Sequence, residues 1–173
     1  TRLTRLAEIT ADQVSDDTRR CWIWSQIAKT IAGYAPDAAL KAALRAETAA
    51  HSIDNDKQRQ NALDGTIFAL AKTGHTAHAK TLADSFPAYQ HALALAALAK
   101  ATAESSPIQA RGYAVEAEVL IDDVASREEQ ISAWTVIGCA VAAADPAYAE
   151  ELAGKAQARV LDDADWGPSI SIA

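Results

Sequence analysis

Residues Trp134–Glu150 read WTVIGCAVAAADPAYAE, and the earlier stretch Trp24–Leu40 reads WSQIAKTIAGYAPDAAL. The two stretches share a tryptophan, a proline and the spacing of the apolar residues between them. Apolar residues that recur every three or four positions predict one face of an α-helix. Because a proline in the first turn of a helix costs no hydrogen bond, Pro36 and Pro146 each predict the start of a second helix. Both stretches are therefore interpreted as one helix-turn-helix unit.

Two further copies of this unit lie between them. Residues 95–111, LAALAKATAESSPIQAR, repeat the pattern with Leu95 at the position of Trp24. A weaker copy, GTIFALAKTGHTAHA at 65–79, aligns with Ile67 at the position of Ile27 and places Asp64 at that of Trp24. Repeats of this kind predict hairpins of two helices that stack to bury a shared core.

The composition points to the same fold class. Alanine, the strongest helix former, makes up nearly a quarter of the chain, and only seven residues are glycine. We predict an all-α fold, a right-handed α-solenoid of about four antiparallel helix-turn-helix repeats in a single domain over 1–173, which could be a fragment of a longer repeat protein. The expected helices, roughly nine, are 2–13, 16–33, 36–53, 56–73, 76–85, 87–104, 107–123, 126–144 and 146–161.

Several residues predict where these helices begin and end. Ser126 and Glu129 fit a capping box, and Asp145 before a proline is a good N-cap type. Gly33 and Gly74 lie where the first helix of a unit should stop.

The units resemble tetratricopeptide repeats. WSQIAKTI and WTVIGCAV match that family's first helix, with Ile for Leu, a small Ala or Gly, and Ile or Val for Tyr. The spacing departs from the family's constant repeat length, the closing proline is absent, and Asp64 occupies a Trp or Leu position. HEAT-type and Sel1-like repeats therefore stay open. The resemblance implies a scaffold for protein–protein contacts, without enzymatic chemistry.

Charge and cysteine usage narrow the class of protein. A net charge of −7 disfavours a general nucleic-acid binder. No apolar stretch is long enough for a membrane span, and the first residues lack the apolar core of a signal peptide. Cys21 and Cys139 belong to no metal-ligand spacing, so we expect two reduced, packed thiols in a cytoplasmic protein.

A search for catalytic and metal-ligating groups yields weak candidates. His75 and His78 have the spacing of two metal ligands, but no third ligand lies one turn away, and exposed histidines are ordinary at a helix start. Adjacent carboxylates such as Asp122 and Asp123 lie between predicted helices, where helix capping explains them better than acid–base catalysis. Nucleophile and phosphate-loop motifs are missing. We therefore predict no enzyme activity, no catalytic residues, no cofactor and no metal.

The candidate binding residues are Lys29, Lys72, Lys100 and Trp22. In the register implied by the resemblance, each of the three lysines directly follows a small residue of the first helix, and together they would line a concave groove. Trp22 lies two residues from Trp24, so both cannot face the core. Trp22 is either an exposed anchor for a partner or is covered by the helix expected at 2–13.

These residues predict a module that binds a peptide segment of another protein in a concave groove, with acidic segments as candidate guests. One alternative is a self-assembling or regulatory repeat segment of a larger multidomain protein, which would associate through its terminal helices. A less favoured alternative is an all-α enzyme or a small-ligand binder. Nucleic acid and membranes are not expected partners.

Overall fold

The computed structural model describes residues 9–11 and 13–161, and in this part of the chain the fold is all-α without strands. Residues 9–11 are helical and precede eight longer helices. Their bounds are α2 Asp17–Ile31, α3 Pro36–Ala50, α4 Asp56–Lys72, α5 Thr76–Asp84, α6 Ala88–Thr102, α7 Pro107–Asp122, α8 Arg127–Val141 and α9 Pro146–Leu161. The expected helices from 16 to 161 are confirmed, with ends that differ by a few residues, whereas the one expected at 2–13 lies mostly outside the described residues.

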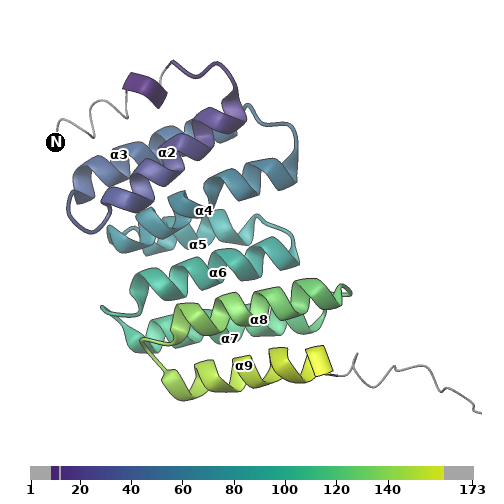
Figure 1. The fold of residues 1–173 in the computed structure, drawn as a ribbon. Coiled ribbons are helices and arrows are strands. Elements are labelled where there is room, and N and C mark those ends of the chain that lie inside the picture. The colour runs from purple at the N-terminus through teal and green to yellow at the C-terminus, as the bar shows by residue number, and fades with distance from the viewer. Residues whose placement is uncertain (1–8, 12, 162–173) are drawn as a thin grey trace, which may run out of the picture.

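The helices form four hairpins packed in series, as Figure 1 shows from α2 and α3 at one end to α8 and α9 at the other. The first helices of successive hairpins contact one another: α2 packs on α4, α4 on α6 and α6 on α8. Each first helix also packs on the second helix of the preceding hairpin, whereas the described second helices do not approach one another as closely. One side of the molecule is therefore a continuous layer of first helices.

Side-chain caps fix the starts of three of the four first helices, α2, α4 and α8, whereas α6 begins after Pro87 without one. Asp16 accepts a hydrogen bond from the backbone N–H of Arg19 at 2.7 Å, and Asn55 does the same for Gln58 at 2.9 Å. Such caps satisfy backbone donors that the helix itself leaves unpaired. Ser126 caps α8 by accepting from Glu129, which confirms half of the expected capping box.

These caps correct the register of the second unit. When the N-cap Asn55 is aligned with the N-cap Asp16, the buried Leu63 takes the position of Trp24. The expectation that Asp64 stands there is wrong by one residue. The cause lies at the end of α4, which has 17 residues where α2 has 15, while the connection to α5 is one residue shorter than the connection from α2 to α3. In the corrected register Phe68, and no lysine, is the counterpart of Lys29.

In three of the four hairpins, the fourth residue of the first helix ties that helix to the backbone just before it. Arg20 donates to the carbonyl of Val14 and Arg59 to the carbonyl of Ile53, both at 3.1 Å. Gln130 donates to the carbonyl of Ile121, in the last turn of α7, at 3.3 Å. The third unit has His91 at this position, which contacts Asp84 at the end of α5. These ties hold three of the hairpins on the segment that precedes them.

Small side chains allow the helices to pack closely. Most of the buried apolar residues are alanines, and Trp24 and Trp134 join them in the core, as predicted. Gly74 ends α4 with a φ of +88°, which glycine adopts without strain. Gly33 also follows the end of α2, as predicted, but without a positive φ.

The two cysteines differ in environment. Cys21 is fully buried, but Cys139 is exposed, which corrects the expectation of two packed thiols. Within the described ranges, the helices lack the length and apolar character needed to cross a membrane.

Candidate functional site

The layer of first helices carries a groove built from one repeated position. Lys29, Phe68, Lys100 and Cys139 are equivalent residues of α2, α4, α6 and α8, and all four line one cavity of about 370 Å³. A position that recurs in every hairpin faces the same side of a stack, because each hairpin repeats the geometry of the last. Apolar Leu93 and Val136 also line this cavity.

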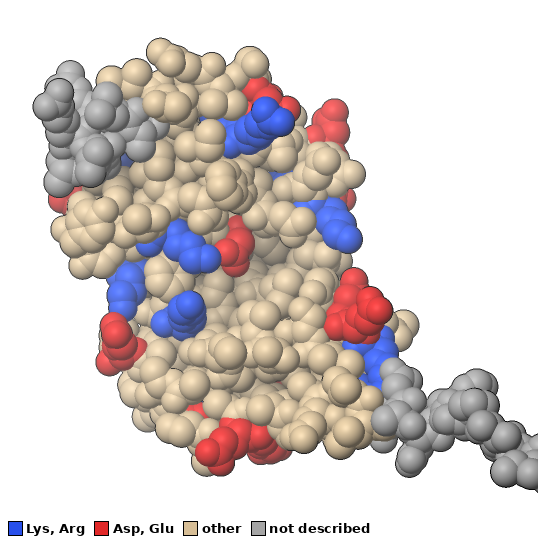
Figure 2. Space-filling view, viewed as in Figure 1, with Lys and Arg blue, Asp and Glu red and all other residues tan. Residues whose placement is uncertain are grey.

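A second cavity of about 290 Å³ adjoins the first, since Asp64 and Leu93 line both. Trp22 stands on its wall. We call the two cavities together the first-helix groove. Figure 2 shows a hollow in the viewed face with basic side chains gathered on one side of it.

Trp22 is an exposed aromatic residue in this groove. Its side chain is 52% exposed, whereas Trp24 is 2% exposed and lies in the core. Of the two interpretations of Trp22, the structure supports the exposed one. Aromatic side chains of this kind offer a large contact area at a low cost in conformational entropy.

The three predicted lysines do not lie together. Lys29 pairs with Asp64 at 3.0 Å, with its ammonium 5.9 Å from the centre of the Phe68 ring. Lys100 is exposed and has no ion-pair partner among the described residues. Lys72 does not line the groove: it ends α4 and pairs with Glu104 at 2.7 Å. That pairing lowers the pKa of the exposed Glu104 carboxyl.

Sequence reasoning missed the polar wall of the groove. Four amide side chains line the cavity beside Trp22, and they come from α2, α4 and α6: Gln26, Gln60, Asn61 and Gln90. An amide both donates and accepts hydrogen bonds, as a peptide backbone requires. Scattered glutamines and asparagines carry no recognisable motif, so only the fold brings them together.

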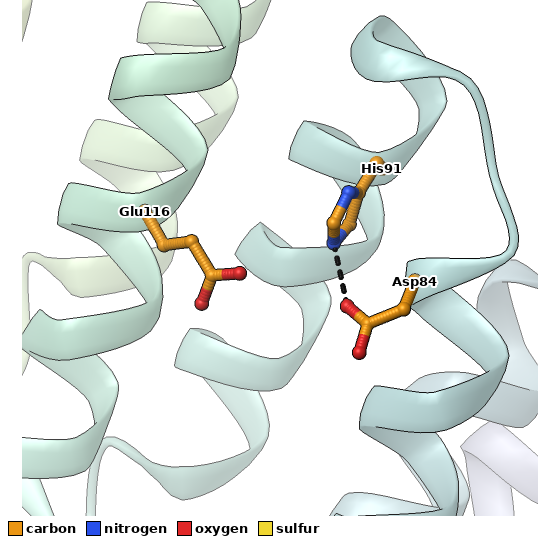
Figure 3. Close-up of side chains that lie close together, drawn as sticks. All are labelled: Asp84, His91 and Glu116. Carbon is orange, nitrogen blue, oxygen red and sulfur yellow. Dashed lines mark ion pairs between the residues drawn. The ribbon is translucent and has the colours of Figure 1, made fainter.

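A cluster of possible metal ligands lies elsewhere, where α5, α6 and α7 meet. Figure 3 shows Asp84, His91 and Glu116, whose ligand atoms lie within 4.8 Å of one another. His91 Nε2 is 2.9 Å from Asp84. However, the Lys80 ammonium contacts both carboxylates, at 2.8 Å for Glu116, and these bonds raise the pKa of Lys80 against the opposing effect of burial. The ammonium already supplies the positive charge between them.

His91 in this cluster is the fourth residue of α6, the position that ties a first helix to the preceding connection in the other units. A structural role therefore explains it without a metal. His75 and His78 do not act as a pair: His78 contacts Glu47 of α3 at 3.2 Å, and His75 lies 3.4 Å from Thr73.

The described groups with clearly shifted pKa values lie outside the groove. They are Cys21, Lys80, Glu104, Tyr113, Tyr148 and Lys155. Burial and the neighbouring Glu118 carboxylate raise the pKa of Tyr148, which belongs to a junction between helices. A catalytic site gathers such groups in a cleft, and this arrangement does not.

Comparison with known proteins adds no family to this description: no protein-family model, curated protein or solved structure matches the chain.

Proposed function

We propose that this protein is a helical repeat scaffold of the tetratricopeptide type, a right-handed solenoid that binds a peptide segment of another protein in the first-helix groove. The groove offers three chemistries along one path: an aromatic anchor at Trp22, amides that can pair with a peptide backbone, and a cation at Lys100. A guest peptide with an apolar residue for Trp22 and an acidic residue for Lys100 fits this order.

The main support for the proposal is that one position of the repeat lines the same cavity in all four hairpins. The residues at this position are Lys29, Phe68, Lys100 and Cys139. Core packing does not require a shared cavity there, because these side chains lie on the outer side of the first-helix layer. A groove that crosses all four hairpins suits an extended chain better than a compact small molecule. Acidic guests also suit Lys100, which gives a local positive field in a chain of net charge −7.

The test is selection of binding peptides from a display library, followed by measurement of Kd for the enriched peptides by fluorescence anisotropy. Trp22→Ala and Lys100→Glu are each expected to weaken binding about tenfold or more, as truncation of a central anchor does. Tyr34→Ala and Lys41→Glu are matched controls, because both residues are exposed and line neither cavity of the groove.

Enriched peptides should share an acidic residue at a fixed distance from an apolar one. Equal losses in the groove variants and the control variants would show that the peptides bind elsewhere. An unchanged Kd in both groove variants would exclude the groove as the binding site.

Self-assembly through the terminal hairpins is the alternative function. Sedimentation velocity at several concentrations separates the two functions, since a peptide-binding scaffold stays monomeric while a self-assembling segment does not. An enzyme or small-ligand binder remains the less favoured alternative, because the groove is open and lies apart from the groups whose pKa values are shifted.

A further inference from the structure

The last hairpin carries a third cavity, which shares Thr135 and Cys139 with the first-helix groove but extends away from it between α8 and α9. It has a volume of about 460 Å³ and lies between α8 and α9. We call it the terminal slot. The residues that matter here are Trp134, Cys139, Ala142, Glu150 and Ala153, all of which line it.

The equivalent slots of other hairpins are occupied by helices of the chain itself. In the first hairpin, α4 packs against α2 and α3, and in the third, α8 packs against α6 and α7. The counterparts of exposed Ala153 are Ala43 and Ala114, and both are fully buried. The terminal slot therefore repeats a surface that takes a helix, and no described helix covers it.

The charge at the rim identifies the kind of guest. In the third hairpin, Arg111 pairs at 2.8 Å with Asp145, which follows the C-terminal end of the incoming α8. The fourth hairpin has Glu150 in place of Arg111, so the charge is inverted. The helix α8 packs in the equivalent slot of the third hairpin, between α6 and α7. A guest helix that packs in the terminal slot in the same way should carry a cation just beyond its C-terminus. A cation is also favourable there because of the helix dipole.

We propose that the terminal slot binds an amphipathic helix of another protein, one with small residues on its apolar face and a lysine or arginine at its C-terminal end, paired with Glu150. A second copy of this chain is a poorer guest for the slot, because end-to-end stacking would bring α2 to it, and residues 32–35, which follow α2, include no cation to pair with Glu150. The proposal is independent of peptide binding in the first-helix groove.

The probe is a pair of synthetic peptides that copy residues 126–145, the helix that occupies the equivalent slot, with C139A to remove the thiol. One peptide keeps Asp145 and the other carries Asp145→Lys. Calorimetry gives Kd, and the rate of alkylation of the protein's Cys139 shows whether a peptide covers this face. Because Cys139 lines both the slot and the first-helix groove, the slot variant Ala153→Trp and the groove variant Lys100→Glu separate the two cavities. The lysine peptide is expected to bind about fivefold more tightly than the aspartate peptide, the upper value for one exposed ion pair.

Glu150→Lys in the protein should reverse this preference, whereas Glu128→Lys, the same charge change at the far end of α8, should not. Ala153→Trp should abolish binding of both peptides, because the indole occupies the slot without entering the core. Lys100→Glu, in the first-helix groove, should leave the Kd unchanged.

Three results would overturn the proposal. The first is that neither peptide binds and Cys139 stays equally reactive. The second is a dimer that Ala153→Trp dissociates, which would make a second copy the guest. The third is a Cys139 that reacts only after residues 162–173 are removed, which would assign the slot to the chain itself.

Discussion

Gly65 is the residue at which α2 and α4 approach most closely. A Cβ added there would lie 2.6 Å from the carbonyl oxygen of Ser25, a backbone atom that cannot rotate away. We expect Gly65→Val to lower the free energy of unfolding by about 2 kcal/mol, because overpacking would push the two helices apart. Urea denaturation followed by circular dichroism measures the change.

Gly112, in the middle of α7, is the matched control because a Cβ added there would have no neighbour within 4 Å. Gly112→Ala should raise the free energy of unfolding by about 0.5–1 kcal/mol through helix propensity alone. If both substitutions changed stability in the same direction, the close approach at Gly65 would not govern the packing of α2 on α4.

The two thiols should differ in reactivity. Burial raises the pKa of the Cys21 thiol to about 12, whereas Cys139 is exposed. A thiol reagent at pH 8 should modify one cysteine per native chain and both after denaturation, because the thiolate is the nucleophile. Rapid modification of two thiols in the native protein would contradict the buried position of Cys21.

The same pKa predicts how stability depends on pH. The unfolded thiol loses its proton near pH 9, from a reference value of 9.0, while the folded protein retains it. The stabilising contribution is therefore complete below pH 9 and is lost as the pH rises towards 12, by about 1 kcal/mol per pH unit. Cys21→Ala should remove this part of the slope in urea titrations between pH 9 and 10.5, and an identical slope in the variant would exclude it.

Among the elements, α7 and α9 are joined through one carboxylate. Glu118 accepts hydrogen bonds from the Tyr148 hydroxyl and the Lys155 ammonium, and its side chain is only 12% exposed. We expect Glu118→Ala to cost about 2 kcal/mol, since it leaves the largely buried Tyr148 hydroxyl without its acceptor and the Lys155 ammonium with only the longer contact to Glu151. Thermal or urea unfolding measures the loss.

Glu104→Ala is the control for Glu118, because Glu104 makes an exposed pair with Lys72. Such surface pairs contribute little to stability, so the unfolding midpoint should not move measurably. A larger effect at Glu104 than at Glu118 would mean that the α7–α9 junction does not depend on this carboxylate.

The elements also show what the sequence could predict. Helix bounds followed from prolines, caps and apolar spacing, because these act over a few residues. The register of the second unit did not, since α4 extends two residues further than α2 and no local signal marks that extension. Phe68, which lines the groove, was therefore missed, and Lys72, four residues beyond Phe68, was predicted in its place.

The groove itself was predictable only in part. Trp22 could be identified because it lies two residues from the core residue Trp24. Lys100 could be identified because it occupies the same position of its repeat unit as Lys29. The amide wall and the Lys29–Asp64 pair depend on how neighbouring hairpins meet, which no local pattern encodes. Cys139 has apolar neighbours in sequence, which predicted a packed thiol, but its side of α8 has no described helix over it.

For the whole molecule, the serial arrangement predicts an order of local opening. The helices α4 and α6 each contact first helices on both sides, whereas the outer face of α9 leaves Val160 and Leu161 exposed. Native-state hydrogen exchange should therefore be slowest in α4 and α6 and faster in α9, since open faces contribute less buried area. Uniform exchange across all helices would show a single cooperative unit instead.

The ties at the fourth residue of α2, α4 and α8 have a consequence for how such a molecule changes length. Each tie joins one hairpin to the few residues just before it, so an additional hairpin of this kind brings its own attachment with it. From the third hairpin to the fourth, both helices shift by the same number of positions along the chain. Duplication of one such segment would extend the groove by one more lining position, with no change needed in the hairpins already present.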